Sequence, residues 1–177
     1  MQVSGEALLE KNLEKKTIVF QTEGCYAVGC LLNDEVGIEK IYAITKQRKK
    51  TPFTVLVGNM SDAYGLVKYP KRLKPYAQFY WPGDAALITE KSTRVTDITS
   101  RGDTVALKLS DDALAKRISN HFGPLVVTCL LDAQANPVTE YEAALVFENT
   151  VDYVVKGENL ETRTSFMFDI DRNKTVF

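Results

Sequence analysis

Residues 104–131 read TVALKLSDDALAKRISNHFGPLVVTCLL, and this stretch decides the fold class. Residues 104–110 are predicted as a strand, and residues 111–123 as an amphipathic helix that Gly123 stops. The strongly apolar run 124–131 is typical of a central strand. A strand, a helix and a second strand in this order indicate an α/β sheet.

The alternation of strands and helices continues over the rest of the 177 residues. Hydrophobic spacing predicts helices over 6–15, 34–45 and 138–147, and helical pieces within 61–80 that are broken at Pro70 and Pro75. Strands are predicted over 17–24, where the strand runs into a loop, and over 53–59, 84–90, 152–157, 165–170 and 175–177. We therefore expect a single domain spanning 1–177, built on a mixed α/β sheet flanked by helices.

The composition excludes several classes of protein. The formal net charge of -1 provides no global field that would attract polyanions, which argues against a dedicated RNA-binding module. Three cysteines without a CxxC pair and a single histidine support neither a disulfide framework nor a zinc site. No apolar run is long enough for a membrane span and the charged N-terminus does not resemble a signal peptide, so we expect a soluble, cytoplasmic protein.

The segment from Gln21 to Gly29 leaves the end of an early strand, where α/β sheets tend to bind ligands. The spacing of its two glycines is that of a phosphate-binding P-loop, but Cys30 and Leu31 occupy the positions of the essential Lys and Ser/Thr. The alternative is a tight turn in which the Thr22 hydroxyl satisfies nearby backbone groups.

Two further segments carry charge that could meet a ligand. In an extended segment Lys46 and Arg48 would share one face and could bind a polyphosphate together, whereas at a helix end they would be solvated cations. Lys108 lies within a strand that is predicted to be buried. Its charge therefore needs an anion or water as a partner, unless the strand is at an exposed edge of the sheet. In Trp81-Pro82-Gly83 the tryptophan either packs into the core at a turn or provides an aromatic surface for a ligand.

Six segments, in this order, resemble signatures of the YrdC/Sua5 family. They are Gln21-Thr22-Glu23 with Tyr26-Ala27-Val28-Gly29, Lys46-Gln47-Arg48 with Pro52, Trp81-Pro82-Gly83, the strand VALKL, residues 123–128, and Thr164-Ser165 with Asp169. The resemblance implies a YrdC-like twisted mixed sheet with a concave cavity.

The resemblance also implies a function. Such proteins of the short type are threonylcarbamoyl-AMP synthases, nucleotidyltransferases that convert L-threonine, bicarbonate and ATP with Mg²⁺ into L-threonylcarbamoyladenylate and pyrophosphate, for the t6A modification of tRNA. It implies that Lys46 and Arg48 are catalytic and hold phosphates, and that Thr22 and Tyr26 contact threonine. It further assigns ATP contacts to Lys108, Thr128, Cys129 and Ser165. No protein-held metal and no membrane are expected, and tRNA or the t6A transferase is the implied macromolecular partner.

The chain departs from the family pattern at Cys129 and Leu131, which replace the Ser and Asn of a Ser-x-Asn motif, and at Lys108, which replaces an Arg. This leaves open a catalytically weakened nucleotide- or RNA-binding relative, or a structural partner in tRNA modification. An RNA patch would combine basic and aromatic side chains, and its alternative is a solvated helix face. Its members are Lys68, Tyr69, Lys71, Arg72, Lys74 and Tyr76.

Overall fold

A computed structural model, which describes residues 1–48, 51–100 and 102–176, contains one mixed sheet of ten strands within those ranges. Across the sheet the order is β1 (Gln2–Val3), β8 (Tyr153–Val155), β2 (Ile18–Gln21), β3 (Tyr26–Leu31), β7 (Leu125–Cys129), β4 (Thr54–Val57), β6 (Thr104–Leu109), β5 (Ala85–Glu90), β9 (Phe166–Asp169) and β10 (Lys174–Val176). Parallel pairs such as β4 with β6 occur beside antiparallel pairs such as β3 with β7. The predicted mixed α/β sheet is confirmed.

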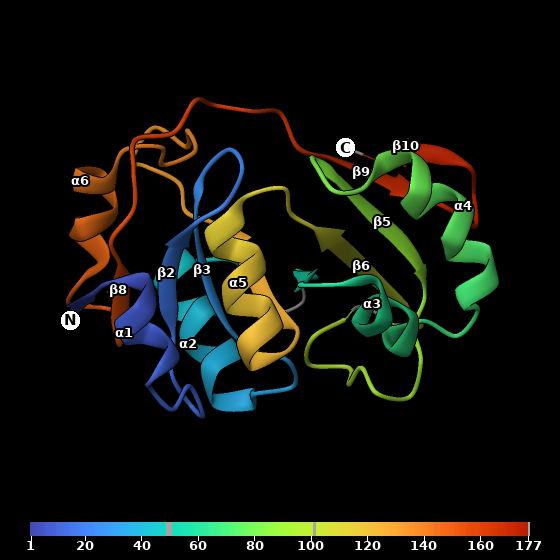
Figure 1. The fold of residues 1–177 in the computed structure, drawn as a ribbon, viewed down its shortest axis with the longest axis horizontal. Coiled ribbons are helices and arrows are strands. Elements are labelled where there is room, and N and C mark those ends of the chain that lie inside the picture. The colour runs from blue at the N-terminus through green and yellow to red at the C-terminus, as the bar shows by residue number, and fades with distance from the viewer. Residues whose placement is uncertain (49–50, 101, 177) are drawn as a thin grey trace.

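Helices cover both faces of this sheet. They are α1 (Gly5–Leu9), α2 (Glu35–Thr45), α3 (Met60–Leu66), α4 (Pro70–Tyr80), α5 (Ala113–Phe122) and α6 (Tyr141–Ala144), which continues into the 3₁₀ turn η1 (Leu145–Phe147). Figure 1 shows α5 in front of the central strands, α1 beside β2 and β8, α2 behind β2 and β3, and α3 and α4 beside the β6 and β5 end. None of the helices formed by the described residues is long and apolar enough to span a bilayer.

The pleat of the strands distributes apolar side chains between two cores. On β2, Ile18 and Phe20 pack with Leu8 of α1 and Ile118 of α5. Val19, between them, points to the opposite face and packs in the cluster of α2. Because successive side chains of a strand alternate between faces, β2 is buried on both sides and is apolar from Ile18 to Phe20.

A third cluster forms under α3 and α4. On β6, Val105, Leu107 and Leu109 pack into it, whereas Ala106 and Lys108 occupy the alternate positions and are half-buried. The opposite face of β6 is therefore less completely covered, and it is the face that carries Lys108.

Local capping explains where the two best-predicted helices begin and end. Asp34 accepts a hydrogen bond from the Gly37 amide at 3.0 Å and starts α2, and Asp112 does the same for Ala115 at 2.8 Å in α5. Gly123 ends α5 with φ of 86°, a left-handed conformation that favours glycine.

Three differences between the structure and the sequence prediction concern long segments. Residues 26–31, predicted as loop up to Gly29, form strand β3, which pairs with β2 around a short turn. The helix predicted over 6–15 ends at Leu9. Leu13 belongs to the irregular segment that follows α1, and its side chain is nevertheless buried in the core. Pro75 does not break α4, whose buried residues Leu73 and Ala77 anchor the helix to the core on either side of it.

Candidate functional site

A cavity of about 650 Å³ lies on the sheet and is partly enclosed. Strands β3 to β7 supply its floor, and the turn 22–25 between β2 and β3 overhangs it. Residues 51–53 and 162–167 also line it, together with Gln47, Leu131, Pro137 and Val176. The concave cavity expected from the sequence is therefore present, and segments distant in the sequence converge on it.

One side of the cavity, which we call the β6 wall, is a network of Lys108, Glu23 and Ser165. The Lys108 ammonium forms an ion pair with the Glu23 carboxylate and donates a hydrogen bond to the Ser165 hydroxyl at 2.8 Å. The second Glu23 oxygen accepts a hydrogen bond from the Ser110 hydroxyl. Lys108 thus has the anionic partner that a lysine in this strand requires.

Burial makes this ion pair consequential. The Glu23 side chain is only 2% exposed and that of Lys108 is 12% exposed. Charges removed from water to this extent depend on each other, because removing one leaves the other buried without compensation. The β6 wall is therefore a preassembled charged group that any ligand in the cavity meets.

The opposite side, which we call the β7 wall, consists of Gln47, Thr128, Cys129 and Leu131. The Gln47 amide donates a hydrogen bond to the Thr128 hydroxyl at 3.2 Å. Leu131 is 47% exposed and lines the cavity as an apolar surface. This wall offers an amide, a hydroxyl and sulfur, and none of its four side chains is charged.

The turn 22–25 connects the two walls. The Thr22 hydroxyl donates a hydrogen bond to the Cys25 carbonyl at 2.8 Å, so the tight-turn interpretation of Thr22 is correct, while Thr22 also lines the cavity. Cys25 and Cys129 form a disulfide across 104 positions. The cysteine spacing predicted no disulfide framework, and this pair was missed because only the fold brings the two residues together.

The segment 162–165 lies against the turn as part of the cavity rim. A Cβ added to Gly24 would lie 2.9 Å from Cβ and 3.0 Å from the backbone nitrogen of Arg163, so only glycine allows this approach. The Arg163 guanidinium donates hydrogen bonds to Asp111 at 3.0 Å and to Asp84 at 2.9 Å, and these bonds to both carboxylates raise its pKa. The rim is thereby attached to the loops that precede α5 and β5.

A family model named Sua5_yciO_yrdC and described as telomere recombination matches residues 11–173. The chain belongs to this Sua5/YciO/YrdC family. Threonylcarbamoyl-AMP synthase of Stutzerimonas stutzeri is 30% identical over 123 residues, which cover 68% of this chain and 63% of the relative. Threonylcarbamoyl-AMP synthase of Pyrococcus abyssi is 24% identical over 148 residues, which cover 81% of this chain and 44% of the relative. The chain thus spans about half to two thirds of the length of these two relatives.

Solved structures of the Sua5/YciO/YrdC family share the fold. P. abyssi Sua5 in complex with L-threonine superposes with a TM-score of 0.83 at 20% identity, covering 96% of this chain and 53% of that one. Escherichia coli YciO gives a TM-score of 0.79 at 18% identity, covering 96% and 87%. The YrdC-like fold expected from the sequence motifs is confirmed.

The cavity brings together five of the eight residues to which the family resemblance assigned a role. They are Thr22, Lys108, Thr128, Cys129 and Ser165. Tyr26 instead is fully buried in a core cluster, and its hydroxyl donates to the Glu158 carbonyl at 2.9 Å. The buried position of the Tyr26 side chain does not favour the expected contact with threonine.

Lys46 and Arg48 have a different placement from the one expected. Both are exposed and neither belongs to the described cavity lining, whereas Gln47 between them does. Lys46 ends α2 in a left-handed conformation with φ of 54°, so the chain turns here and leaves the helix. The remaining basic positions 49 and 50 of this segment lie outside the described residues. The two cations therefore flank a residue of the cavity without lining it themselves.

The structure also decides the other sequence alternatives. Trp81 packs into the core at the turn, because it is only 8% exposed and its indole N–H donates a hydrogen bond to the Ala85 carbonyl at 2.8 Å. In the candidate RNA patch, Lys68 pairs with Glu90 at 2.9 Å and Arg72 with Asp171 at 2.6 Å. These carboxylates neutralise two of the four cations, which favours the solvated helix face.

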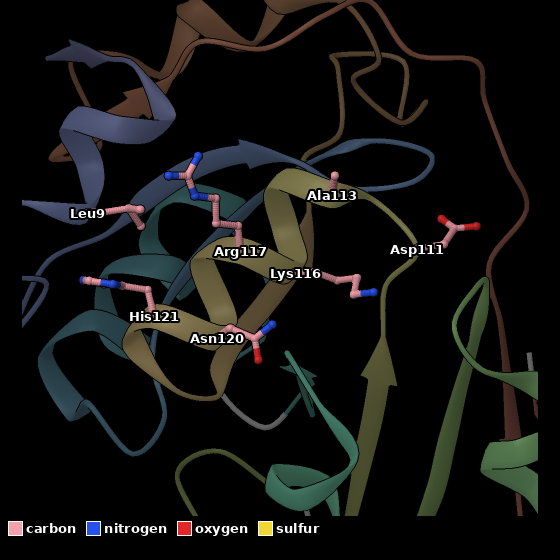
Figure 2. A pocket seen from close by; sticks show the side chains of 7 residues that line it. All are labelled: Leu9, Asp111, Ala113, Lys116, Arg117, Asn120 and His121. Carbon is pink, nitrogen blue, oxygen red and sulfur yellow. The ribbon is translucent and has the colours of Figure 1, made fainter.

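A second depression of about 640 Å³ lies on the outer face of α5 (Figure 2). The labelled side chains do not converge: Arg117 and His121 extend to one side of the helix, and Lys116 and Asn120 to the other. Arg117 is paired with Glu6, so its charge is already compensated. This depression presents no assembled chemical group.

Among the side chains of the cavity that sequence reasoning missed, Glu23, Gln47 and Arg163 lie next to predicted positions. Glu23 follows Thr22 in the same motif and Gln47 is the middle residue of Lys-x-Arg, so both were adjacent to predicted positions. Arg163 precedes the Thr164-Ser165 motif in the same way. No periodicity distinguishes these residues, because their orientation is set by turns.

Proposed function

We propose that this chain is a threonylcarbamoyl-AMP synthase, a nucleotidyltransferase that forms L-threonylcarbamoyladenylate from L-threonine, bicarbonate and ATP and releases pyrophosphate for t6A modification of tRNA. The observation that carries the proposal is the convergence of Thr22, Lys108, Thr128 and Ser165, from four separate family-like motifs, on one cavity. The two relatives named for this activity support it.

The chemistry of the cavity suits the proposed reaction. The threonine amine takes up bicarbonate with loss of water, the resulting N-carboxylate attacks the α-phosphorus of ATP, and pyrophosphate leaves with the broken P–O bond. This reaction needs positioning and charge stabilisation more than a protein nucleophile. The Lys108 ammonium, held in place by Glu23 and Ser165, is a hydrogen-bond donor inside the cavity, and its charge is balanced by the Glu23 carboxylate.

Magnesium enters this scheme with its substrate. No cluster of three or more His, Cys, Asp and Glu side chains that could hold a metal occurs among the described residues. We propose that Mg²⁺ is carried by the phosphates of ATP, which is the usual way that this ion is bound at phosphoryl-transfer sites. The neutral groups of the β7 wall, Gln47 and Thr128, are then available to the nucleoside part of ATP.

The test of the proposal is pyrophosphate release with ATP·Mg²⁺, bicarbonate and L-threonine. We expect pyrophosphate only when all three substrates are present, and a threonylcarbamoyl-adenylate mass in the products. Release that does not depend on threonine, or no release above background, would contradict the proposal. L-valine in place of L-threonine is the matched control, because it keeps the branched shape and lacks the hydroxyl.

Lys46 and Arg48 remain predicted phosphate contacts. Their exposed position beside the cavity residue Gln47 requires the segment to fold inward when ATP binds. Lys46→Ala and Arg48→Ala should each lower kcat/KM for pyrophosphate release by about 10- to 100-fold, since a hydrogen bond to a charged group contributes about 1.5–3 kcal/mol. Lys71→Ala, on the exposed face of α4, is the control and should leave kcat/KM unchanged. Wild-type rates in both variants would remove these two residues from the site.

A binding protein without turnover is the second candidate. It is favoured by Cys129 and Leu131, which put sulfur and an alkyl group on the β7 wall where the family pattern has a hydroxyl and a carboxamide. Calorimetric titration with ATP in the absence of turnover would support it. Salt-dependent binding of RNA that is lost when Lys68, Lys71, Arg72 and Lys74 are neutralised would extend it to RNA.

A further inference from the structure

Two of the three cysteines of the chain line the cavity at the boundary between the turn 22–25 and the β7 wall. Cys25 is in the turn and Cys129 ends β7, and their Cα atoms are 6.1 Å apart. Disulfides in proteins usually join Cα atoms about 4.4–6.8 Å apart, so the backbone already holds these residues at a suitable distance.

Both sulfur atoms are accessible to small molecules that enter the cavity. Cys25 and Cys129 are half-buried and belong to its lining. The Thr22 hydroxyl lies 3.8 Å from the Cys25 sulfur, and the Leu130 carbonyl lies 3.5 Å from that of Cys129. Both cysteines therefore lie where a small disulfide that enters the cavity can reach them.

Cys30 provides an internal comparison. It is fully buried on β3, and burial, with a smaller contribution from Asp34, raises the pKa of its thiol. A buried thiol with a raised pKa is unreactive. The same chain therefore carries two accessible cysteines that meet and one that is chemically protected.

We propose that Cys25 and Cys129 are a reversible dithiol and disulfide site that reacts with low-molecular-weight disulfides of the glutathione type entering the cavity. One cysteine thiolate attacks the small disulfide, forms a mixed disulfide with the protein and releases one small thiol. The second cysteine then attacks the protein sulfur of that mixed disulfide, and the second small thiol leaves. The protein dithiol loses two electrons and two protons, and the small disulfide becomes two thiols.

The redox state of this site determines whether the turn 22–25 is covalently attached to the β7 wall. The disulfide fixes the turn that carries Thr22 and Glu23 to the end of β7, and so fixes the distance between the β6 wall and the β7 wall. Reduction releases the turn, which is then held by its backbone hydrogen bonds, such as that from Thr22 to Cys25 at 2.9 Å. A fixed turn requires less ordering when a ligand binds. In this respect the inference rests on the proposed function, because the ligands are its substrates.

The decisive experiment is thiol counting after treatment with oxidised glutathione. In the reduced protein, a maleimide should label Cys25 and Cys129 without denaturant and leave Cys30 unlabelled. After oxidised glutathione both labels should be lost, a peptide mass should link Cys25 to Cys129, and dithiothreitol should restore the labelling. Cys30→Ala should behave as the wild type. Persistent labelling of both cysteines, or glutathione that stays attached to the wild-type protein, would overturn the proposal.

A second variant separates the site from simple surface reactivity. In Cys129→Ser the resolving thiol is absent, so glutathione should accumulate as a stable mixed disulfide on Cys25. Oxidation should raise the urea midpoint of the wild type and leave that of Cys129→Ser unchanged, because only the wild type closes the long loop. Equal shifts in both proteins would contradict a Cys25 to Cys129 link.

The turnover assay is independent of these measurements. We expect oxidation to lower the KM for L-threonine about two- to tenfold through the fixed turn, by an amount typical of modest preorganisation. Thiol reactivity with no pyrophosphate release in either redox state would refute the proposed function and leave the thiol site standing. Pyrophosphate release with an unreactive cysteine pair would refute the thiol site and leave the proposed function standing.

Discussion

The two walls of the cavity are built differently although they face the same space. The β6 wall contains a nearly buried ion pair, Glu23 with Lys108, supported by the hydroxyls of Ser110 and Ser165. The β7 wall contains one neutral hydrogen bond, a disulfide and an alkyl side chain. The two walls thus differ in chemistry, because one holds an ion pair whose charges balance and the other holds neutral groups.

This difference indicates which part of a ligand each wall can bind. A carboxylate or phosphate can accept hydrogen bonds from the Lys108 ammonium of the β6 wall, whereas a neutral ring or amide suits the β7 wall. The β6 wall is also the more sensitive of the two, because a buried charge cannot lose its partner cheaply. Mutations on the two walls should therefore differ in their size and in their kind.

The largest effect is expected from breaking the charged pair. Glu23→Ala leaves the Lys108 ammonium without its carboxylate and should lower the free energy of unfolding by about 3–5 kcal/mol, measured by urea denaturation. Glu23→Leu combined with Lys108→Met should recover much of this loss, because no charge then stays buried.

An exposed ion pair of the same chain is the matched control for that measurement. Glu6 pairs with Arg117 on the surface, where solvent screens the interaction, so Glu6→Ala should leave the urea midpoint near that of the wild type. If Glu23→Ala shifted the midpoint no more than Glu6→Ala, the β6 wall would not be the charged core of the site.

A smaller effect is expected on the β7 wall. Gln47→Ala and Thr128→Val should each lower the free energy of unfolding by about 0.5–1.5 kcal/mol, because each removes the same neutral hydrogen bond. The double variant should lose less than the sum of the two, which a double-mutant cycle in urea measures. Strict additivity would show that the two side chains do not act together.

The smallest effect on the cavity is expected from Tyr26, which lies beneath the walls. Burial is the main cause that raises the pKa of Tyr26 to about 12, against an unfolded value of about 10. The protonated phenol therefore contributes stability that is complete below pH 10 and is lost as the pH rises towards 12. Tyr26→Phe should remove this part of the alkaline decline in the free energy of unfolding and leave the KM for threonine unchanged. A raised KM would return Tyr26 to the substrate site.

Sequence patterns predicted the elements that are long or capped. Asp34, Asp112 and Gly123 mark helix ends through local hydrogen bonding and backbone conformation, which is why α2 and α5 were predicted closely. Strand β3 was missed because its glycine and its short turn resemble a loop, and only pairing with β2 and β7 makes it a strand.

The site could be predicted in part for the same physical reason. Motif residues such as Thr22 and Lys108 lie on strands or tight turns, where position in the sequence fixes orientation, and they do face the cavity. Lys46 and Arg48 lie after a helix end, where one left-handed residue redirects the chain and the spacing no longer gives the direction of a side chain. The pairing of Cys25 with Cys129 depends on strand order, which no local pattern contains.

The rim segment has a consequence for how the molecule acquires its cavity. Figure 1 shows the chain running from β8 over the top of the molecule to β9, which pairs with β5 in parallel, Ala85 opposite Phe166. The rim segment and β9 follow β2 to β7 in the chain, so synthesis delivers them after these central strands. A nascent chain thus has its central strands before it has a pocket, and substrates that occupy the finished pocket would act chiefly by slowing its reopening.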